Sequence, residues 1–371
     1  MPGNMTATQG TAPGLVALFG SGETAASGRS VYNWLFQRLS SPIRAAVLET
    51  PAGFQPNSAL VAEEVADFLR HRLRNHQPVV TVVPARARGT AFSPDDPDII
   101  GPLHRCNAIF LGPGSPTHAA RQLQDSLAWH TVVGLHRLGA AVIFASAAAI
   151  AAGARVLPVY EIFKAGEDLH WQAGLDFFGP YGLPLVFVPH WNNTEGGAGL
   201  DTSRCYMGDA RWARLLALLP PHLTILGLDE HTALIMDLAA GQCRVMGRGS
   251  VTVIKAGVER RFNPTDAMPM PMSILGSLRL PPPEAGLPAA VWESVHGAGS
   301  QAPNVLLAPP AQVLALAQDR QAARDCRDWT QADALRRRMA TLGWEVRDTP
   351  QGPQLEALSP SRAAAGGDSG T

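Results

Sequence analysis

Short apolar runs alternate with stretches of helical periodicity over the first 150 residues of the chain. The sequence predicts five buried strands, at residues 15–19, 45–48, 79–83, 108–111 and 140–144. Between them, apolar residues recur at helical spacing, as they do over residues 60–73. Continuously apolar strands that alternate with helices are typical of a parallel sheet with helices on both faces. We therefore expect an α/β fold with a doubly wound, mostly parallel sheet.

The pattern changes in the second half of the chain. Strand-like segments there follow in the order 185–188, 223–228, 232–237 and 242–254. The last of these contains a Gly-Arg-Gly turn at residues 247–249. We expect these segments to form an antiparallel extension on the edge of the sheet.

Composition sets the predicted domain boundaries. Residues 1–13 and 359–371 are rich in small and polar residues, which predicts disordered tails. Residues 261–310 are dense in proline, which forbids long helices and central strands and predicts a linker, either extended or partly packed. The main α/β domain is then expected at 14–260. A small module of helices and a hairpin is expected at 311–358, where helical periodicity returns. It should dock on the main domain or pair with a partner, because so short a segment is marginally stable alone. The contacts buried there would be Trp329, Leu335, Met339 and Trp344.

Charge and cysteine usage narrow the functional classes. The formal net charge of −1 gives no general attraction to nucleic acid or to an anionic membrane. The four cysteines lie far apart without a CxxC pair, which argues against a disulfide framework and suits a reducing cytosol. There is no basic segment followed by an apolar one at the N-terminus, and no apolar run of membrane-spanning length. A cytoplasmic protein without membrane contact is expected.

Candidate chemistry gathers where the predicted strands end. Ligands of open parallel sheets bind outside the carboxyl ends of the strands. Four loops should therefore converge at one edge, those at residues 20–24, 112–116, 145–149 and 189–197.

Ser146 stands between a buried strand and the small-residue start of a helix. That position exposes a nucleophile and aims helix amides at a developing oxyanion. A serine needs a base, and His190 at the end of a later strand is the best candidate. A carboxylate should orient the imidazole; Glu161 is the nearest sensible choice, with Glu167 and Asp168 as rivals. Helix packing alone is the alternative explanation for Ser146.

Two segments give these residues a family resemblance. F-A-S-A-A-A at residues 144–149 and G-L-D-E-H-T-A-L at residues 227–234 resemble motifs of the dipeptidase E and cyanophycinase family. This resemblance implies a serine peptidase on a flavodoxin-like, class I glutamine-amidotransferase-like fold. It assigns the nucleophile to Ser146, the base to His190 and the acid to Glu161. The oxyanion donors would be the amides of Gly114 and Ala147.

The elbow around Ser146 departs from that family in two positions. Phe144 and Ala148 replace glycines, and a Cβ there costs about 1 kcal/mol each if the family's backbone strain is retained. Because the nucleophile position holds serine rather than cysteine, ammonia transfer from glutamine is not expected.

Other polar residues of these loops are candidates for substrate binding. They are Glu23, Ser115, Asn192, Asn193 and Glu195. The alternative is that the asparagines and Glu195 cap and turn the chain. His190, Asp201, Cys205 and His231 have the chemistry of metal ligands, but their scattered spacing disfavours a metal site. No metal or other cofactor is expected.

The C-terminal segment resembles a second family. A-R-D at 323–325, D-W at 328–329, A-D-A-L-R at 332–336 and D-T-P-Q-G at 348–352 are similar to the C-terminal end of cysteinyl-tRNA synthetases. Signatures resembling H-I-G-H and K-M-S-K-S are absent, so synthetase activity is not expected. Arg336, Arg337 and Arg338 would allow RNA contact, but a solvated helical hairpin is the favoured interpretation.

Two hypotheses follow from these residues. The first is a serine hydrolase that cleaves a small peptide or amide. The second is a non-catalytic binding module of the same fold, associated with RNA. A hydrogen bond between Ser146 and His190 would favour the first, whereas side chains in different cavities would exclude it. An oligomer is compatible with either hypothesis.

Overall fold

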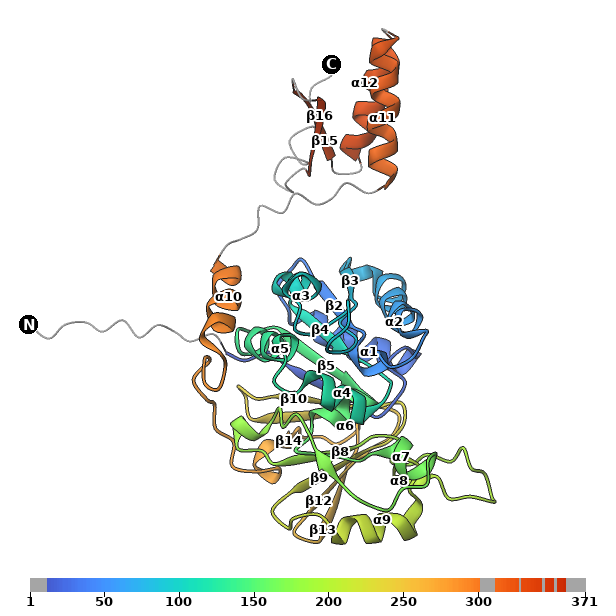
Figure 1. Cartoon of the computed structure of the whole chain (residues 1–371), viewed down its shortest axis with the longest axis vertical. Coiled ribbons are helices and arrows are strands. Elements are labelled where there is room, and N and C mark those ends of the chain that lie inside the picture. Colours follow the sequence, from blue (N-terminus) through green and yellow to red (C-terminus); the bar gives the residue numbers. More distant parts are fainter. Residues whose placement is uncertain (1–11, 301–310, 327, 342–343, 350–351, 358–371) are drawn as a thin grey trace, which may run out of the picture. The chain divides into compact units, whose positions relative to one another are not determined.

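The computed structural model describes residues 12–300, 311–326, 328–341, 344–349 and 352–357 (Figure 1). The chain divides near residue 301 into a large unit and a small C-terminal unit. The predicted tails lie almost entirely outside the described residues, as does the segment 301–310.

An eight-stranded sheet forms the centre of the large unit, in the order β14-β11-β10-β1-β5-β4-β2-β3. Its parallel part consists of β1 (Val16–Phe19), β2 (Arg44–Leu48), β3 (Val79–Val83), β4 (Ala108–Leu111) and β5 (Ala141–Ala145). Strands β2 to β5 have a flavodoxin-like arrangement, and β1 occupies the place where the fifth strand of such sheets lies. The predicted α/β class is confirmed.

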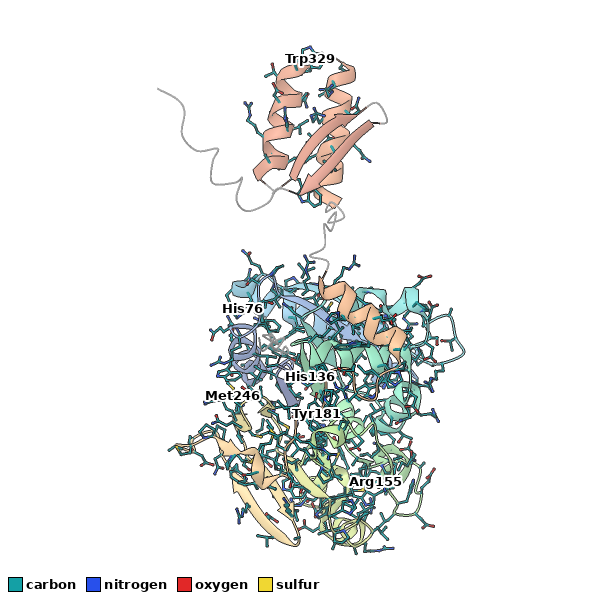
Figure 2. The ribbon with its side chains drawn as sticks, turned by 90° about the vertical axis from the view of Figure 1, so that its left-hand side faces the viewer. His76, His136, Arg155, Tyr181, Met246 and Trp329 are labelled. Atoms are coloured by element: carbon teal, nitrogen blue, oxygen red, sulfur yellow. The ribbon has the colours of Figure 1, made fainter. Side chains whose placement is uncertain are left out.

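Helices cover both faces of this sheet because successive strand residues point to opposite sides. Ala17 and Phe19 of β1 pack in a core with α1 (Ala26–Phe36) and α2 (Ser58–Arg72). Val16 and Leu18 face a second core with α4 (Pro116–Leu123), α5 (Leu127–Arg137) and α6 (Ala147–Ala152). In that core the Tyr181 hydroxyl donates to His136 Nδ1 at 3.1 Å, because His136 Nε2 donates to the Gly14 carbonyl (Figure 2). The shorter helical elements are η1 (Thr50–Ala52), η2 (Arg74–His76), α3 (Pro97–Ile100), η3 (Gly101–Arg105), α7 (Val159–Phe163), η4 (Gly179–Tyr181) and α8 (Ser203–Tyr206).

The antiparallel edge consists of β10 (Thr232–Asp237), β11 (Gln242–Gly247) and β14 (Met270–Pro271). The other late strands form a separate sheet in the order β13-β12-β9-β8, with β8 (Leu185–Val188), β9 (Thr224–Leu228), β12 (Val251–Lys255) and β13 (Val258–Phe262). The expectation of one edge extension was therefore wrong in part. The chain changes sheets at Gly247, whose φ of 116° and close approach to His231 require glycine. Helix α9 (Gly208–Ala217) precedes β9, and β6 (Arg155–Val156) pairs with β7 (Gln172–Ala173).

Most of the predicted Pro-rich linker belongs to the large unit, which corrects its predicted boundary at residue 260. Met272 of η5 (Met272–Ile274) and Leu275 are fully buried in the core. Val291 and Val295 of α10 (Ala289–Ser300) are also buried there. Proline density prevents long regular elements, but it does not prevent burial of the side chains between the prolines.

The small unit contains α11 (Ala311–Asp325), α12 (Trp329–Thr341) and an antiparallel pair of β15 (Trp344–Thr349) and β16 (Gly352–Ala357). Met339, Trp344 and, partly, Leu335 are buried in the unit's own core, so docking through these residues stays a prediction. Trp329 is 57% exposed (Figure 2). It lies at the start of α12, where its ring approaches the Arg324 guanidinium at 5.6 Å.

Candidate active site

Ser146 lies in a strained turn at the end of β5. Its φ of 50° and ψ of −112° are unusual for a residue with a Cβ, and α6 begins at the next residue. The backbone of Phe144 and Ala148 is not left-handed, so the expected strain at these two positions is absent. Phe144 instead packs its ring against Phe177, with centroids 5.3 Å apart. Within the elbow at residues 144–149, Ser146 is the one residue with a positive φ.

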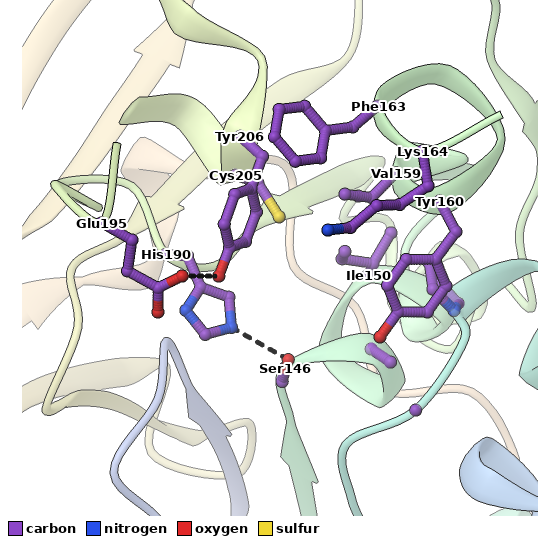
Figure 3. A pocket seen from close by; sticks show the side chains of 13 residues that line it. Ser146, Ile150, Val159, Tyr160, Phe163, Lys164, His190, Glu195, Cys205 and Tyr206 are labelled. Carbon is purple, nitrogen blue, oxygen red and sulfur yellow. Dashed lines mark hydrogen bonds between the residues drawn. The ribbon is translucent and has the colours of Figure 1, made fainter. Parts of the chain in front are cut away.

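His190 faces Ser146 from the end of β8. Ser146 Oγ lies 3.0 Å from His190 Nε2 (Figure 3). The His190 amide donates to the carbonyl of Gly20 at 3.2 Å, which fixes the end of β8 beside the end of β1. Although β8 belongs to the second sheet, its loop thus meets the loops after β1 and β5. The fourth predicted loop reaches the same pocket through Gly114.

The carboxylate that contacts His190 is Glu230, not Glu161. Glu230 Oε1 lies 3.0 Å from His190 Nδ1. Glu161 lies on α7, is not among the residues that line the pocket at Ser146, and has one buried oxygen without a hydrogen-bond partner in the described part of the chain. The expectation for Glu161 was therefore wrong. The rivals Glu167 and Asp168 also make no contact with His190 among the described interactions.

Sequence proximity to the serine misled the choice of carboxylate, whereas strand pairing points to Glu230. Strands β8 and β9 are parallel neighbours, with Val188 opposite Gly227. His190 and Glu230 each lie two residues beyond the end of their strand, so the two side chains meet. The G-L-D-E segment at residues 227–230 already contained the residue.

Asn192 and Asn193 hold Glu230 and do not line the pocket. Asn193 Nδ2 donates to Glu230 Oε1 at 2.9 Å, and Asn192 Oδ1 accepts from the Glu230 amide at 2.8 Å. The hydrogen bond from His190, followed by that from Asn193, lowers the pKa of Glu230 below its ordinary value. These two asparagines therefore hold the Glu230 carboxylate in place. We had expected them to contact the substrate instead.

Ser115 also has a structural role. Its hydroxyl accepts from the His118 amide at 3.1 Å and caps α4, and its own amide donates to Pro51. It does not line the pocket at Ser146, contrary to the expectation of substrate binding. Glu23 likewise is not a lining residue, but it lies near His190 and His231. Burial raises the pKa of Glu23, while its own backbone amide and these histidines lower it.

A pocket of about 210 Å³ opens at Ser146. Ile150, Val159 and Phe163 contribute apolar surface, and Lys164 contributes a cation (Figure 3). On the side of His190, the Tyr206 hydroxyl donates to Glu195 Oε2 at 2.8 Å. Glu195 is thus the one predicted substrate-binding residue that lines this pocket.

Gly114 and Ala147 both line the pocket beside the serine. Gly114 has a φ of 150°, and a Cβ there would lie 1.9 Å from the Pro51 carbonyl oxygen, so only glycine fits. Ala147 is the first residue of α6, where a backbone amide has no partner within the helix. The positions of both amides suit an oxyanion formed at Ser146.

The metal-ligand alternative finds no support in the described residues. Within them, no group of three or more His, Cys, Asp and Glu side chains is arranged to hold a metal ion. His190 is engaged by Ser146 and Glu230. Burial, and secondarily the charge of Glu230, raises the pKa of the Cys205 thiol to about 12, which disfavours the thiolate that metals bind.

The large unit has a fold that is also found in a solved peptidase structure. The chain is similar to the solved structure of a peptidase from an acI-B1 Actinobacterium, with a TM-score of 0.56 and 19% identity. The likeness covers 71% of this chain and 99% of that one. At this identity it establishes the fold.

The C-terminal resemblance is confirmed by sequence. Residues 308–354 match the family model of the cysteinyl-tRNA ligase anticodon binding domain. The chain is 38% identical over 47 residues to a cysteine–tRNA ligase of Methanosarcina mazei, and 34% identical over 96 residues to cysteine–tRNA ligase 1 of Burkholderia lata. These matches cover 13% and 25% of this chain, and they span 10% and 20% of the ligases.

Among the described helices, none has the length and apolar character needed to cross a bilayer.

Proposed function

We propose that the large unit is a serine hydrolase that cleaves a small peptide or amide. The observation that carries this proposal is the hydrogen-bonded chain from Ser146 through His190 to Glu230, which ends at a pocket. A nucleophile, a base and a carboxylate in mutual contact are the elements of a catalytic triad. The peptidase fold supports the same conclusion.

In the proposed reaction, Ser146 Oγ attacks the carbonyl carbon while its proton passes to His190 Nε2. The amides of Gly114 and Ala147 stabilise the oxyanion, and each such donor typically contributes a factor of about 10² to 10³. The C–N bond then breaks, and His190 returns the proton to the leaving amine. Water, deprotonated by His190, hydrolyses the acyl-enzyme and releases Ser146. Glu230 stabilises the imidazolium that forms in each half.

The pocket supports a small substrate with charged groups. Its volume of about 210 Å³ lies below the ~300–1,000 Å³ common for ligand pockets. Lys164 is suited to an anionic group and Glu195 to a cationic one.

Labelling with a fluorophosphonate tests the proposal, because such a probe reacts only with an activated serine. We expect one adduct on the full-length protein, located at Ser146 by peptide mass spectrometry and lost in Ser146→Ala. Ser30→Ala is the matched control, since Ser30 is an exposed serine on α1 that bonds only its own helix. An unlabelled wild type would favour the alternative, a binding module that keeps the fold without the chemistry and associates with RNA through its small unit.

A further inference from the structure

Two exposed aromatic rings lie together at the edge of the Ser146 pocket. Phe54 is 47% and Tyr160 is 40% exposed, and their ring centroids are 6.4 Å apart. Tyr160 also lines the pocket. Among the exposed large apolar side chains of the described residues, no other two are in ring contact. We call Phe54 and Tyr160 the aromatic rim.

The Phe54 half of the rim is positioned by contacts beside the proposed oxyanion loop. Thr50 Oγ1 donates to the Ala85 carbonyl at 2.6 Å, and the Pro51 carbonyl accepts from the Ser115 amide at 2.9 Å. These contacts fix the turn that carries Phe54. Its ring then packs on the buried ring of His118, with centroids 5.5 Å apart. Because packing on His118 already positions the Phe54 ring, contact with a ligand there costs little additional conformational entropy.

The chemistry of the site decides which part of a substrate meets the rim. The leaving amine must receive its proton from His190 Nε2, so it lies on the histidine side of Ser146. Tyr160 lies on the other side of Ser146 from His190 (Figure 3). The rim is therefore on the side of the acyl group.

We propose that Phe54 and Tyr160 form a subsite for an apolar, preferably aromatic, side chain on the acyl side of the scissile bond. This inference rests on the proposed hydrolase function and names its substrate class. Aromatic pairs in offset or edge-to-face geometry favour such a side chain over a methyl group beyond the effect of buried area alone. Loss of the Phe54 ring should therefore lower the preference for an aromatic over a methyl side chain about two- to tenfold.

The test compares two amides that share one chromogenic amine and differ in the acyl residue, phenylalanine or alanine. The full-length wild type should have the higher kcat/KM for the phenylalanine amide. Phe54→Ala should reduce that ratio about two- to tenfold, mainly through the phenylalanine substrate, and Phe54→Leu should reduce it less. Phe92→Ala is the matched control, because Phe92 is similarly exposed, at 39%, but stacks on Arg86 outside the pocket.

The outcomes separate this inference from the function on which it rests. An active wild type whose ratio is unchanged in Phe54→Ala, or in which both substrates lose equally, would overturn the subsite and leave the hydrolase proposal intact. A wild type that neither cleaves the amides nor reacts with benzyl- and methyl-substituted fluorophosphonates at Ser146 would overturn both. If cleavage is too slow to measure, the ratio of the two labelling rates gives the same comparison.

Discussion

The large and the small unit resemble known proteins in different ways. The large unit shares its fold with a solved peptidase structure at 19% identity, so its likeness is one of structure. The small unit carries a family match over residues 308–354, so its likeness is one of sequence. Yet every residue that lines the Ser146 pocket belongs to the large unit.

The difference follows from what each unit must preserve. The central sheet needs only apolar residues of suitable size at buried positions, and many sequences satisfy that requirement. The small unit is a compact helical pair with a hairpin, and its core includes Met339 and Trp344. A short run of residues there still matches the family model of the ligase domain. A name taken from the sequence match would therefore describe the unit that does not contain the candidate chemistry.

The largest expected effect is that of Ser146→Ala on turnover. Loss of the nucleophile of a triad typically lowers kcat by about 10⁶. The hydroxyl has one recorded partner, His190, so the unfolding free energy should change by only about 0.5 kcal/mol. Hydrolysis assays and thermal denaturation check the two parts. Retained activity would locate the chemistry elsewhere, and marked unfolding would show that the hydroxyl is structural.

Truncation sharpens the contrast between the units. A chain that ends at residue 300 should stay folded and keep the Ser146 chemistry. A chain that ends at residue 258 loses five buried apolar side chains, those of Met270, Met272, Leu275, Val291 and Val295. Burial of each contributes about 1.5–3 kcal/mol, and a domain has only about 5–15 kcal/mol in total. We expect this chain to aggregate. Circular dichroism and labelling of Ser146 measure both results, and a stable, reactive shorter chain would restore the boundary near residue 260.

Glu230→Gln should lower kcat by about 10² to 10⁴, because the histidine loses the charge that stabilises its imidazolium. Glu161→Gln is the matched control and should keep wild-type kcat, since Glu161 makes no contact with His190 among the described interactions. Steady-state kinetics at one pH separates the two variants. A loss of kcat in Glu161→Gln, with wild-type kcat in Glu230→Gln, would show that Glu161 is the carboxylate that acts on His190.

The Glu230 carboxylate should also change how stability depends on pH. Its pKa in the folded protein lies below the ordinary 4.5, because His190 and Asn193 bond the charged form. A depressed pKa stabilises the fold above the ordinary value, and this stabilisation is lost as the pH falls through the folded pKa. Between about pH 6 and about pH 3 the wild type should therefore lose more Tm than Glu230→Gln. An equal loss of Tm in the two proteins over this pH range would contradict the lowered pKa of Glu230.

The smallest expected effect is a difference in cysteine reactivity between the two units. Cys326 of the small unit is exposed, whereas burial raises the pKa of Cys106 to about 11 and of Cys205 to about 12. Iodoacetamide at neutral pH should therefore modify Cys326 first. Intact and peptide mass spectrometry measure the order. Early modification of Cys205 would mean that the pocket opens in solution.

Periodicity predicted the parallel sheet and its strands, because buried strands differ from amphipathic helices in their apolar pattern. Ser146 and His190 followed from their positions at strand ends. Glu230 did not, because its contact with His190 depends on the pairing of β8 with β9, which is a long-range feature. The buried part of residues 261–300 was missed for a related reason. The core contacts of Met272 and Leu275 leave no periodic signal in a proline-rich segment.

The backbone at Ser146 has a consequence for the history of this chain. At a φ of 50° and a ψ of −112°, glycine would fold with less strain than serine, by about 1 kcal/mol or more. Selection for stability alone would therefore favour glycine here, so a serine that is retained indicates selection on its hydroxyl. Comparing the residue at this position among related sequences would therefore indicate, without an assay, in which of them the hydroxyl was kept.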